Sequence, residues 1–491
     1  MRGVIKNGRV LKGAPVPSAS TSVSAVAVHT TSASSSLLDE NTLSPAGVPT
    51  QTARKTAAPG AVHTTTRKSS FQGGNVPSWA DSREPTSTLG IPSRTTFNSW
   101  KPPTSLGGLW EMLNLEGAGG LSAMPQRAAQ TAYTAARMAF FFAQSALISR
   151  SLGVEMSALP NGGPMPPDVS KEAADKMVQD SLGGIVELTK MDIENVRRGI
   201  YRAPYDMDPR HRQWSPAFWA DQHERLLRDR REGKEIRLKK DTRVRSASEA
   251  DGYPAYYLQH FHWQPGGWLS DESAQIYEHS TESLFFGAQD MMQRQALVPL
   301  HYFMRGRDPA RTSVLDVACG TGRFLTFLKD NYPAVRTYGV DLSPNYLKTA
   351  EANMGYFEKF DMKVNGSRIF SRAQFIQANA ERLPFEDSSL DVVTCVYLFH
   401  ELPPNARQAV AQEVSRVLKP GGIFIWADAT QDGDRPEIAQ AAGIFNRMFH
   451  EPYFSSFFRA DFKPMFAASG LGHEATILAH LTKVMCFRKG F

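Results

Sequence analysis

Two glycines after a hydrophobic run give this chain its clearest chemical signal. The run Ser313–Val317 has the branched, apolar character of a buried parallel strand, and Gly320 and Gly322 follow its carboxyl end. Glycine lets a backbone turn sharply and approach a ligand without a Cβ in the way. The apolar spacing of residues 323–330 predicts a helix directly after the turn. This order of elements is typical of a site for a nucleotide-like cofactor at a helix N-terminus.

An acidic residue stands where such a cofactor needs one. The segment Arg336–Asp341 predicts a second strand, and its last residue comes 19 positions after Gly322. A doubly wound fold places a carboxylate there to receive the hydroxyls of a ribose. Asp341 is therefore the first predicted cofactor ligand. A dehydrogenase would be expected to have a third glycine shortly after Gly322, where this chain has Phe324 and Leu325.

Four further motifs follow in order along the chain. They are Phe375–Asp387 (FIQANAERLPFED), Leu390–Tyr397 (LDVVTCVY), Glu413–Gly422 (EVSRVLKPGG) and Ile423–Asp428 (IFIWAD). With the first two segments, they resemble class I S-adenosylmethionine-dependent methyltransferases of the ubiquinone/menaquinone type, the methyltransferase type 11 domain. The resemblance implies an α/β fold with a Rossmann-like sheet of seven strands. Residues 474–480 and 484–489 would form its terminal antiparallel hairpin.

The resemblance implies S-adenosylmethionine as the cofactor and assigns residues to it. Asp316 would lie near the amino-acid moiety, with the loop glycines against it. Asn379 occupies the position that reads adenine in the family, and its amide oxygen can accept a hydrogen bond. Ala318, where many members have glycine, is expected to keep a negative φ. The predicted cofactor residues are Asp316, Ala318, Gly320, Gly322, Asp341, Leu342, Asn379 and Ala380.

Two residues are predicted to act on the acceptor. Methyl transfer is an in-line displacement, so the protein mainly aligns the acceptor with the methyl group and excludes water. An O- or N-acceptor also needs a base, and His400 follows the fourth strand at the ligand-binding rim. Glu401 is expected to be its partner or the start of the next helix. The alternative for His400 is a structural role against the cofactor. Asp428, at the end of the fifth strand, is the second predicted catalytic residue.

The segment from residue 256 to residue 287 is rich in aromatic residues. In related methyltransferases, the segment before the core folds over the cofactor and forms part of the acceptor pocket. Aromatic walls exclude water and bind flat apolar acceptors, although ordinary core packing would also explain them. His260 and His262 are expected to project to opposite sides of a strand, so no metal site is predicted. A second aromatic-rich segment, residues 451–466, contains Arg459 and is expected to line the acceptor pocket, with covering of the sheet as the alternative. The predicted acceptor-pocket residues are Trp268, Tyr277, Tyr397 and Arg459.

Composition divides the chain into three parts. Residues 1–100 are predicted to be disordered, residues 101–255 a mostly helical accessory region, and residues 256–491 the methyltransferase domain, with its core at 300–491. Residues 1–80 are rich in Ser, Thr, Ala, Pro and Val and are acid-poor and basic, which resembles an organelle transit peptide or a generic disordered tail. The aromatic segment resembles uncharacterised methyltransferase-like proteins of plastids and cyanobacteria. A chloroplast is therefore expected, with the mitochondrion as the alternative.

Charge and hydropathy limit the partners. The net charge of +6 is concentrated in residues 225–245, which have little aromatic interleaving, so a solvated helix or linker is favoured over a nucleic-acid site. The most apolar stretch, residues 129–148, contains Arg137 and Gln144, so a packed helix is expected, with peripheral membrane contact as the alternative. Three separated cysteines form no disulfide framework or CxxC motif.

The predicted function is methyl transfer from S-adenosylmethionine to a small acceptor that is aromatic or isoprenoid-derived. Two alternatives stay open: a non-catalytic protein that keeps the fold for assembly or scaffolding, and an RNA methyltransferase. The sequence does not predict the identity of the acceptor, the methylated atom or the oligomeric state.

Overall fold

The computed structural model describes residues 5–6, 9–10, 77–81, 87–101, 124–153, 170–244, 252–366, 370–436 and 449–490. These residues belong to one compact unit, residues 3–12 and 76–491. Most of the predicted transit peptide lies outside the described residues. Near the N-terminus, β1 (Ile5–Lys6) and β2 (Arg9–Val10) pair as a short antiparallel ribbon.

A seven-stranded sheet forms the carboxyl-terminal domain. Its strands are β3 (Ser313–Val317), β4 (Arg336–Asp341), β5 (Gln374–Gln377), β6 (Leu390–Val396), β7 (Leu418–Ala429), β8 (Leu471–Ala479) and β9 (Thr482–Lys489). They lie in the order β5-β4-β3-β6-β7-β9-β8, with β3 to β7 parallel and β9 antiparallel to both β7 and β8. The predicted Rossmann-like sheet and its terminal hairpin are confirmed. The order reverses beside β3, where open sheets bind ligands.

Both faces of the central strands are buried. On β7, Ile423 and Ile425 belong to one hydrophobic cluster, while Phe424 and Trp426 belong to a second. Successive side chains of a strand point to opposite faces, so one strand joins two cores. This explains why the motif at the fifth strand is almost continuously apolar rather than alternating.

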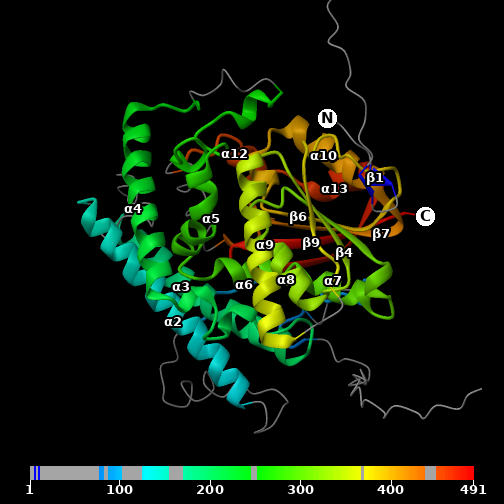
Figure 1. Ribbon diagram of the computed structural model, residues 1–491, viewed down its shortest axis with the longest axis horizontal. Coiled ribbons are helices and arrows are strands. Elements are labelled where there is room, and N and C mark those ends of the chain that lie inside the picture. Colours follow the sequence, from blue (N-terminus) through cyan, green and yellow to red (C-terminus); the bar gives the residue numbers. More distant parts are fainter. Residues whose placement is uncertain are drawn as a thin grey trace, which may run out of the picture. The chain divides into compact units, whose positions relative to one another are not determined.

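Helices cover the sheet on both sides. Those of the domain are α6 (Gln289–Arg294), α7 (Leu297–Met304), α8 (Arg323–Asn331), α9 (Pro344–Asn365), α10 (Pro404–Val417), α12 (Phe454–Phe458) and α13 (Phe462–Ala468), with the 3-10 turns η7 (Pro309–Arg311) and η8 (Phe399–Glu401). Helices α8 and α9 pass in front of the strands in Figure 1. Buried residues of α8 join the first cluster, and those of α10 and α13 join the second.

Four further helices precede α6 in the described part of the chain. They are α2 (Met124–Ser151), α3 (Lys171–Arg197), α4 (Pro216–Lys239) and α5 (Asp271–Leu284), with 3-10 turns η2 (Tyr205–Met207), η3 (Arg212–Trp214), η5 (Ala255–Tyr257) and η6 (Phe261–Trp263) between them. Helices α2, α3 and α4 lie within residues 101–255, for which a mostly helical accessory region was predicted. None of the described helices is long and apolar enough to span a bilayer.

Residues 87–101 lie along the edge strand β8. The backbone N–H of Arg94 donates to Thr476 O at 2.7 Å, and the N–H of Leu478 donates to Arg94 O at 2.8 Å. The Thr88 backbone N–H donates to the Glu474 carboxylate at 2.8 Å. These bonds cover part of an otherwise open sheet edge. The domain holds this segment, although all but its last residue belongs to residues 1–100, for which disorder was predicted.

Candidate functional site

The glycine-rich loop leaves β3 through a run of left-handed conformations. The φ angles of Ala318, Gly320 and Gly322 are +56°, +55° and +76°. Our expectation of a negative φ at Ala318 was wrong, because the chain reverses direction immediately at the strand end. There the N–H of Cys319 donates to Val340 O at 2.9 Å. A left-handed alanine costs about 1–2 kcal/mol, so tertiary contacts hold this turn in place.

Asp341 supports the loop from the end of β4. Its Oδ2 accepts the N–H of Gly320 at 2.9 Å, and its Oδ1 accepts the N–H of Ser343 at 2.8 Å. Burial raises the pKa of Asp341, and these backbone hydrogen bonds oppose that shift. Each carboxylate oxygen keeps a further lone pair. Asp341 can therefore fix the loop and still accept hydrogen bonds from a ribose diol.

A cavity opens over this loop, with an empty volume of about 1050 Å³ that includes its mouth. Seven of the eight predicted cofactor residues line it: Asp316, Ala318, Gly320, Asp341, Leu342, Asn379 and Ala380. Gly322 instead lies behind the loop, where an added Cβ would meet the Cβ of Ala350 at 3.2 Å. The aromatic segment contributes Tyr256, Tyr257, Phe261, Trp268 and Tyr277 to the same lining. The structure thus brings the predicted cofactor set and the aromatic segment to one cavity.

Asp316 is a buried carboxyl group on the wall of this cofactor cavity. Its side chain is 2% exposed, and Thr394 Oγ1 donates to its Oδ1 at 2.6 Å. Burial raises the pKa of Asp316 to about 7, because a carboxylate loses hydration there, and the hydrogen bond from Thr394 only partly offsets this loss. A cationic ligand beside Asp316 would favour its ionised form.

Asn379 sits in a tight turn after β5. Its Oδ1 accepts the N–H of Glu381 at 2.9 Å. Glu381 in turn accepts a hydrogen bond from the Tyr256 hydroxyl at 2.6 Å. The amide oxygen of Asn379 is thus already used once, and its remaining lone pair is the acceptor left for a ligand.

A second cavity adjoins the first. Both cavities are lined by Trp268, Tyr277, Tyr397 and Glu401. The first three are predicted acceptor-pocket residues, and His400 lines the second cavity as well. Arg459 lines neither cavity among those found in the described part of the chain; it is exposed at the end of α12, and its Nε donates to Ser455 O. The structure does not bring Arg459 to the site.

The two predicted catalytic residues are partners of each other. His400 Nδ1 lies 2.6 Å from Asp428 Oδ1, whereas the expected partner Glu401 is 3.5 Å from His400 Nε2. The Asp428 carboxylate is fully buried and also accepts the N–H groups of Phe399 and Ala429. Burial lowers the pKa of His400, but Asp428 and Glu401 outweigh this effect and raise it well above its ordinary value. Asp428 thus orients His400 and favours its charged form.

The two histidines before the core do not lie on a strand. His262 belongs to the 3-10 turn η6, and His260 directly precedes it with Nδ1 3.0 Å from Gln264 O, so the expected projection to opposite sides of a strand was wrong. A Pro-Gly-Gly turn follows too closely for a strand to form. The ring of His262 instead contacts Glu401 at 2.8 Å and Glu451 at 3.2 Å.

The two acidic partners of His262 differ in the direction of their pKa shifts. Burial raises the pKa of Glu401, but the charges of His262 and His400 lower it to about 2. Burial raises the pKa of Glu451 to about 7 despite the same two histidines. Burial lowers the pKa of His262, and the two carboxylates reverse that shift. Glu451 and His262 were not among the predicted site residues.

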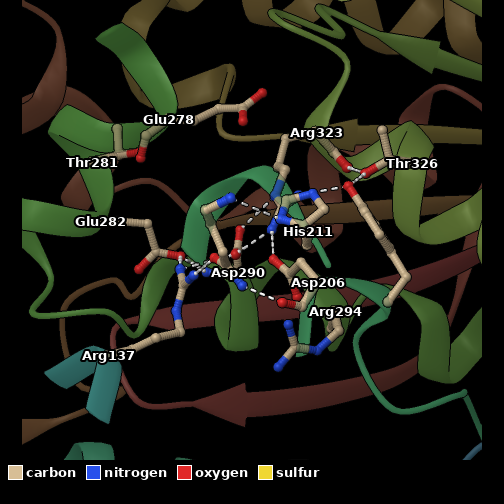
Figure 2. Close-up of polar contacts among 12 residues, drawn as sticks. Arg137, Asp206, His211, Glu278, Thr281, Glu282, Asp290, Arg294, Arg323 and Thr326 are labelled. Carbon is tan, nitrogen blue, oxygen red and sulfur yellow. Dashed lines mark hydrogen bonds and ion pairs between the residues drawn. The ribbon is translucent and has the colours of Figure 1, made fainter. Parts of the chain in front are cut away.

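Buried ion pairs join the accessory helices to the cofactor loop. Arg323, the first residue of α8, lies between Asp206 and Asp290 at 2.6 Å from each (Figure 2). Arg137 of α2 contacts the same Asp290 at 3.1 Å and Glu282 at 2.7 Å. Beside them, Thr321 Oγ1 of the loop donates to Glu278 of α5 at 2.9 Å. The accessory helices therefore form part of the support of the cofactor loop.

Comparison with known proteins finds methyltransferases. A family model described as a methyltransferase domain matches residues 314–422. A demethylmenaquinone methyltransferase of Lactiplantibacillus plantarum is 27% identical over 194 residues, which are 38% of this chain and 74% of that protein. An uncharacterized methyltransferase of Synechocystis is 32% identical over 135 residues, which are 27% of this chain and 55% of that protein.

Among solved structures, the YcgJ protein from Bacillus subtilis is 18% identical, with a TM-score of 0.30, and the alignment covers 40% of this chain and 99% of that one. The matched family model and the named relatives, together with the strand order and the loop, identify a class I S-adenosylmethionine-dependent methyltransferase domain. The accessory helices lie outside the residues matched by the family model.

Proposed function

We propose that this chain transfers a methyl group from S-adenosylmethionine to a small acceptor with a flat apolar body, either aromatic or isoprenoid-derived. The observation that carries the proposal is the second cavity. It shares three aromatic lining residues, Trp268, Tyr277 and Tyr397, with the cofactor cavity, and His400 also lines it. Two adjoining cavities with a common wall suit a donor and an acceptor held in line.

The residues of the first cavity fit the cofactor. Asp341 has free lone pairs for the ribose hydroxyls, and Asp316 offers a buried carboxyl group to the ammonium of the amino-acid moiety. The bound cofactor supplies a methyl group on a positively charged sulfur. The loop glycines permit close approach of the backbone, since a Cβ at Gly320 would project into open space toward a ligand.

The second cavity supports the acceptor class. Trp268 packs against Tyr277 with ring centroids 5.9 Å apart, which forms a continuous aromatic wall. Such a wall excludes water and binds a flat ring. Asp428 orients His400 through Nδ1, and in its charged form His400 can donate from Nε2, which lies 3.5 Å from Glu401, to an acceptor oxygen. The demethylmenaquinone methyltransferases among the relatives are named for a quinone substrate, which favours a quinone-like acceptor here.

Calorimetric titration with S-adenosylhomocysteine tests the cofactor half of this proposal. We expect saturable binding that Asp341→Ala abolishes, while Glu224→Gln on the exposed face of α4 leaves binding unchanged. Absence of binding at high micromolar ligand would contradict it. Untargeted metabolite profiling of a knockout tests the acceptor half, because an unmethylated ring precursor should accumulate. An unchanged profile, with full complementation by Asp341→Ala, would support the scaffolding alternative.

We propose further that residues 1–80 direct the protein to the plastid. Their basic, hydroxyl-rich and acid-poor composition supports this destination. A fusion of these residues to a fluorescent protein should enter plastids. Mitochondrial or diffuse fluorescence would contradict the assignment.

A peripheral contact with membranes is supported by α2. Phe142 and Leu147 are 46% and 58% exposed on that helix. Such side chains can enter the headgroup region of a bilayer. Co-sedimentation with anionic phospholipid vesicles should decrease in the double variant Phe142→Ser, Leu147→Ser, and equal sedimentation of both proteins would contradict the contact.

A further inference from the structure

Three side chains of metal-ligating type converge beside the second cavity. His262 Nε2 lies 2.8 Å from Glu401 Oε1, and His262 Nδ1 lies 3.2 Å from Glu451 Oε1. One ligand atom from each residue lies within 4.8 Å of the other two. The residues come from η6, from η8 and from the segment before α12, and all three line the cavity.

The carboxylates have more acceptor capacity than their neighbours use. Glu451 is 2% exposed, and among the described residues its Oε1 has only an ion-pair contact, with His262 Nδ1 at 3.2 Å, while its Oε2 has no hydrogen-bond partner. Glu401 Oε2 also lacks a hydrogen-bond partner within that part of the chain. Buried polar atoms are normally hydrogen-bonded, and each one left unpaired costs about 1–3 kcal/mol. One imidazolium between the carboxylates accounts for one oxygen of each and leaves the others unexplained.

The backbone around His262 is held in an unusual conformation. His262 has φ +55°, and its backbone N–H donates to His450 O at 3.2 Å, next to Glu451 in the chain. Left-handed conformations of such residues persist only where surrounding contacts impose them, and they cluster at ligand-binding sites. The ring of His262 also packs against Trp268 and Phe449, with centroid distances of 5.6 and 6.3 Å. Its position is therefore fixed from several sides.

We propose that His262, Glu401 and Glu451 bind a divalent first-row transition-metal ion with an open coordination position toward the second cavity. One imidazole and two carboxylates suit Mn²⁺, Fe²⁺, Co²⁺ or Zn²⁺ rather than a soft metal. Three protein ligands leave room for a water or a ligand oxygen, as in catalytic zinc sites. Metal–ligand distances of about 2.1 Å place ligand atoms about 3–4 Å apart. Because Glu401 and Glu451 face different ring nitrogens of His262, one of the two carboxylates must turn toward the nitrogen that binds the ion.

This site goes beyond the proposed function and does not depend on it. A methyl acceptor with a hydroxyl or carbonyl oxygen could bind the metal ion at its open coordination position. Only this role of the metal in acceptor binding rests on the proposed methyl transfer. The two claims separate experimentally, because metal binding can be measured without a cofactor or an acceptor. Titration with S-adenosylhomocysteine after chelator treatment tests the cofactor site alone.

Calorimetric titration of the chelator-treated full-length chain with Mn²⁺, Co²⁺ and Zn²⁺ tests the inference. We expect one saturable site per chain, and visible absorption bands of bound Co²⁺ of low coordination number. Glu451→Gln keeps the shape of the side chain and should weaken binding by about tenfold or more, whereas Glu224→Gln on exposed α4 should not change it. His262→Gln provides a second ligand variant if Glu451→Gln does not fold.

Two outcomes would overturn the metal site. One is no saturable binding of any of the three ions up to about 1 mM, well above the range of a built site. The other is binding that both ligand variants retain at wild-type affinity. Either result would mean that His262, Glu401 and Glu451 form ion pairs that stabilise the cavity wall and do not bind a metal ion.

Discussion

Cofactor affinity should depend on pH through Asp316. This carboxyl group is buried in the cofactor cavity, and burial raises its pKa to about 7. Below that pH the empty site holds a proton that must leave before the carboxylate can pair with a cationic ligand. The bound state keeps the carboxylate ionised, so binding releases a proton and is favoured as the pH rises.

The size of the effect follows from this pKa. Each pH unit below about 7 should weaken binding by about tenfold, and above it the affinity should level off. Between about pH 8 and pH 5 the dissociation constant should rise on the order of 100-fold, which equals about 3 kcal/mol. Thr394 would stay hydrogen-bonded to Asp316 in both states, because a protonated carboxyl can still accept through its carbonyl oxygen.

Calorimetry with S-adenosylhomocysteine at several pH values, in buffers of different ionisation enthalpy, measures both the affinity and the proton release. Asp316→Asn is the matched control, since its amide oxygen can still accept from Thr394. The variant should bind more weakly at pH 8 and show a shallower pH profile. Any titration of the ligand itself is common to both proteins. Parallel profiles for the two proteins would refute the role of Asp316.

Three substitutions test the support of the cofactor loop. Asp341→Asn removes a charged acceptor and should weaken S-adenosylhomocysteine binding by about 10- to 100-fold in calorimetry, and an unchanged affinity would contradict the ribose contact. Gly322→Ala, at φ +76°, should lower the free energy of unfolding by about 1–2 kcal/mol in urea titration, whereas a neutral effect would mean that the loop relaxes. Arg323→Met leaves Asp206 and Asp290 without their shared partner and should cost about 3–5 kcal/mol in the same assay; a loss below about 1 kcal/mol would show that the ion pairs contribute little.

The cofactor side of the site could be predicted from the sequence because its signals are local. The loop glycines and Asp341 follow directly after strands, and parallel strands bring their carboxyl ends to one edge of a sheet. Ala318 shows the limit of this reasoning, since a residue type does not fix its φ when tertiary contacts hold the turn.

The acceptor side was less predictable because it is assembled from distant segments. His262 and Glu451 are 189 positions apart (451 − 262), and nothing in either local sequence indicates that they meet. His400 and Asp428 were predicted separately, but their hydrogen bond depends on the pairing of β6 with β7. Arg459 was placed in the pocket from the aromatic character of its segment, yet it is exposed at a helix end. The composition of residues 451–466 indicated an aromatic segment, but it did not indicate which side chains of that segment face the cavity.

A crystal structure with S-adenosylhomocysteine tests the central claim most directly. We predict that the ligand occupies the cavity over the glycine-rich loop, with both ribose hydroxyls within hydrogen-bond distance of the Asp341 carboxylate and the sulfur facing the second cavity. A ligand bound elsewhere, or a ribose turned away from Asp341, would contradict the account.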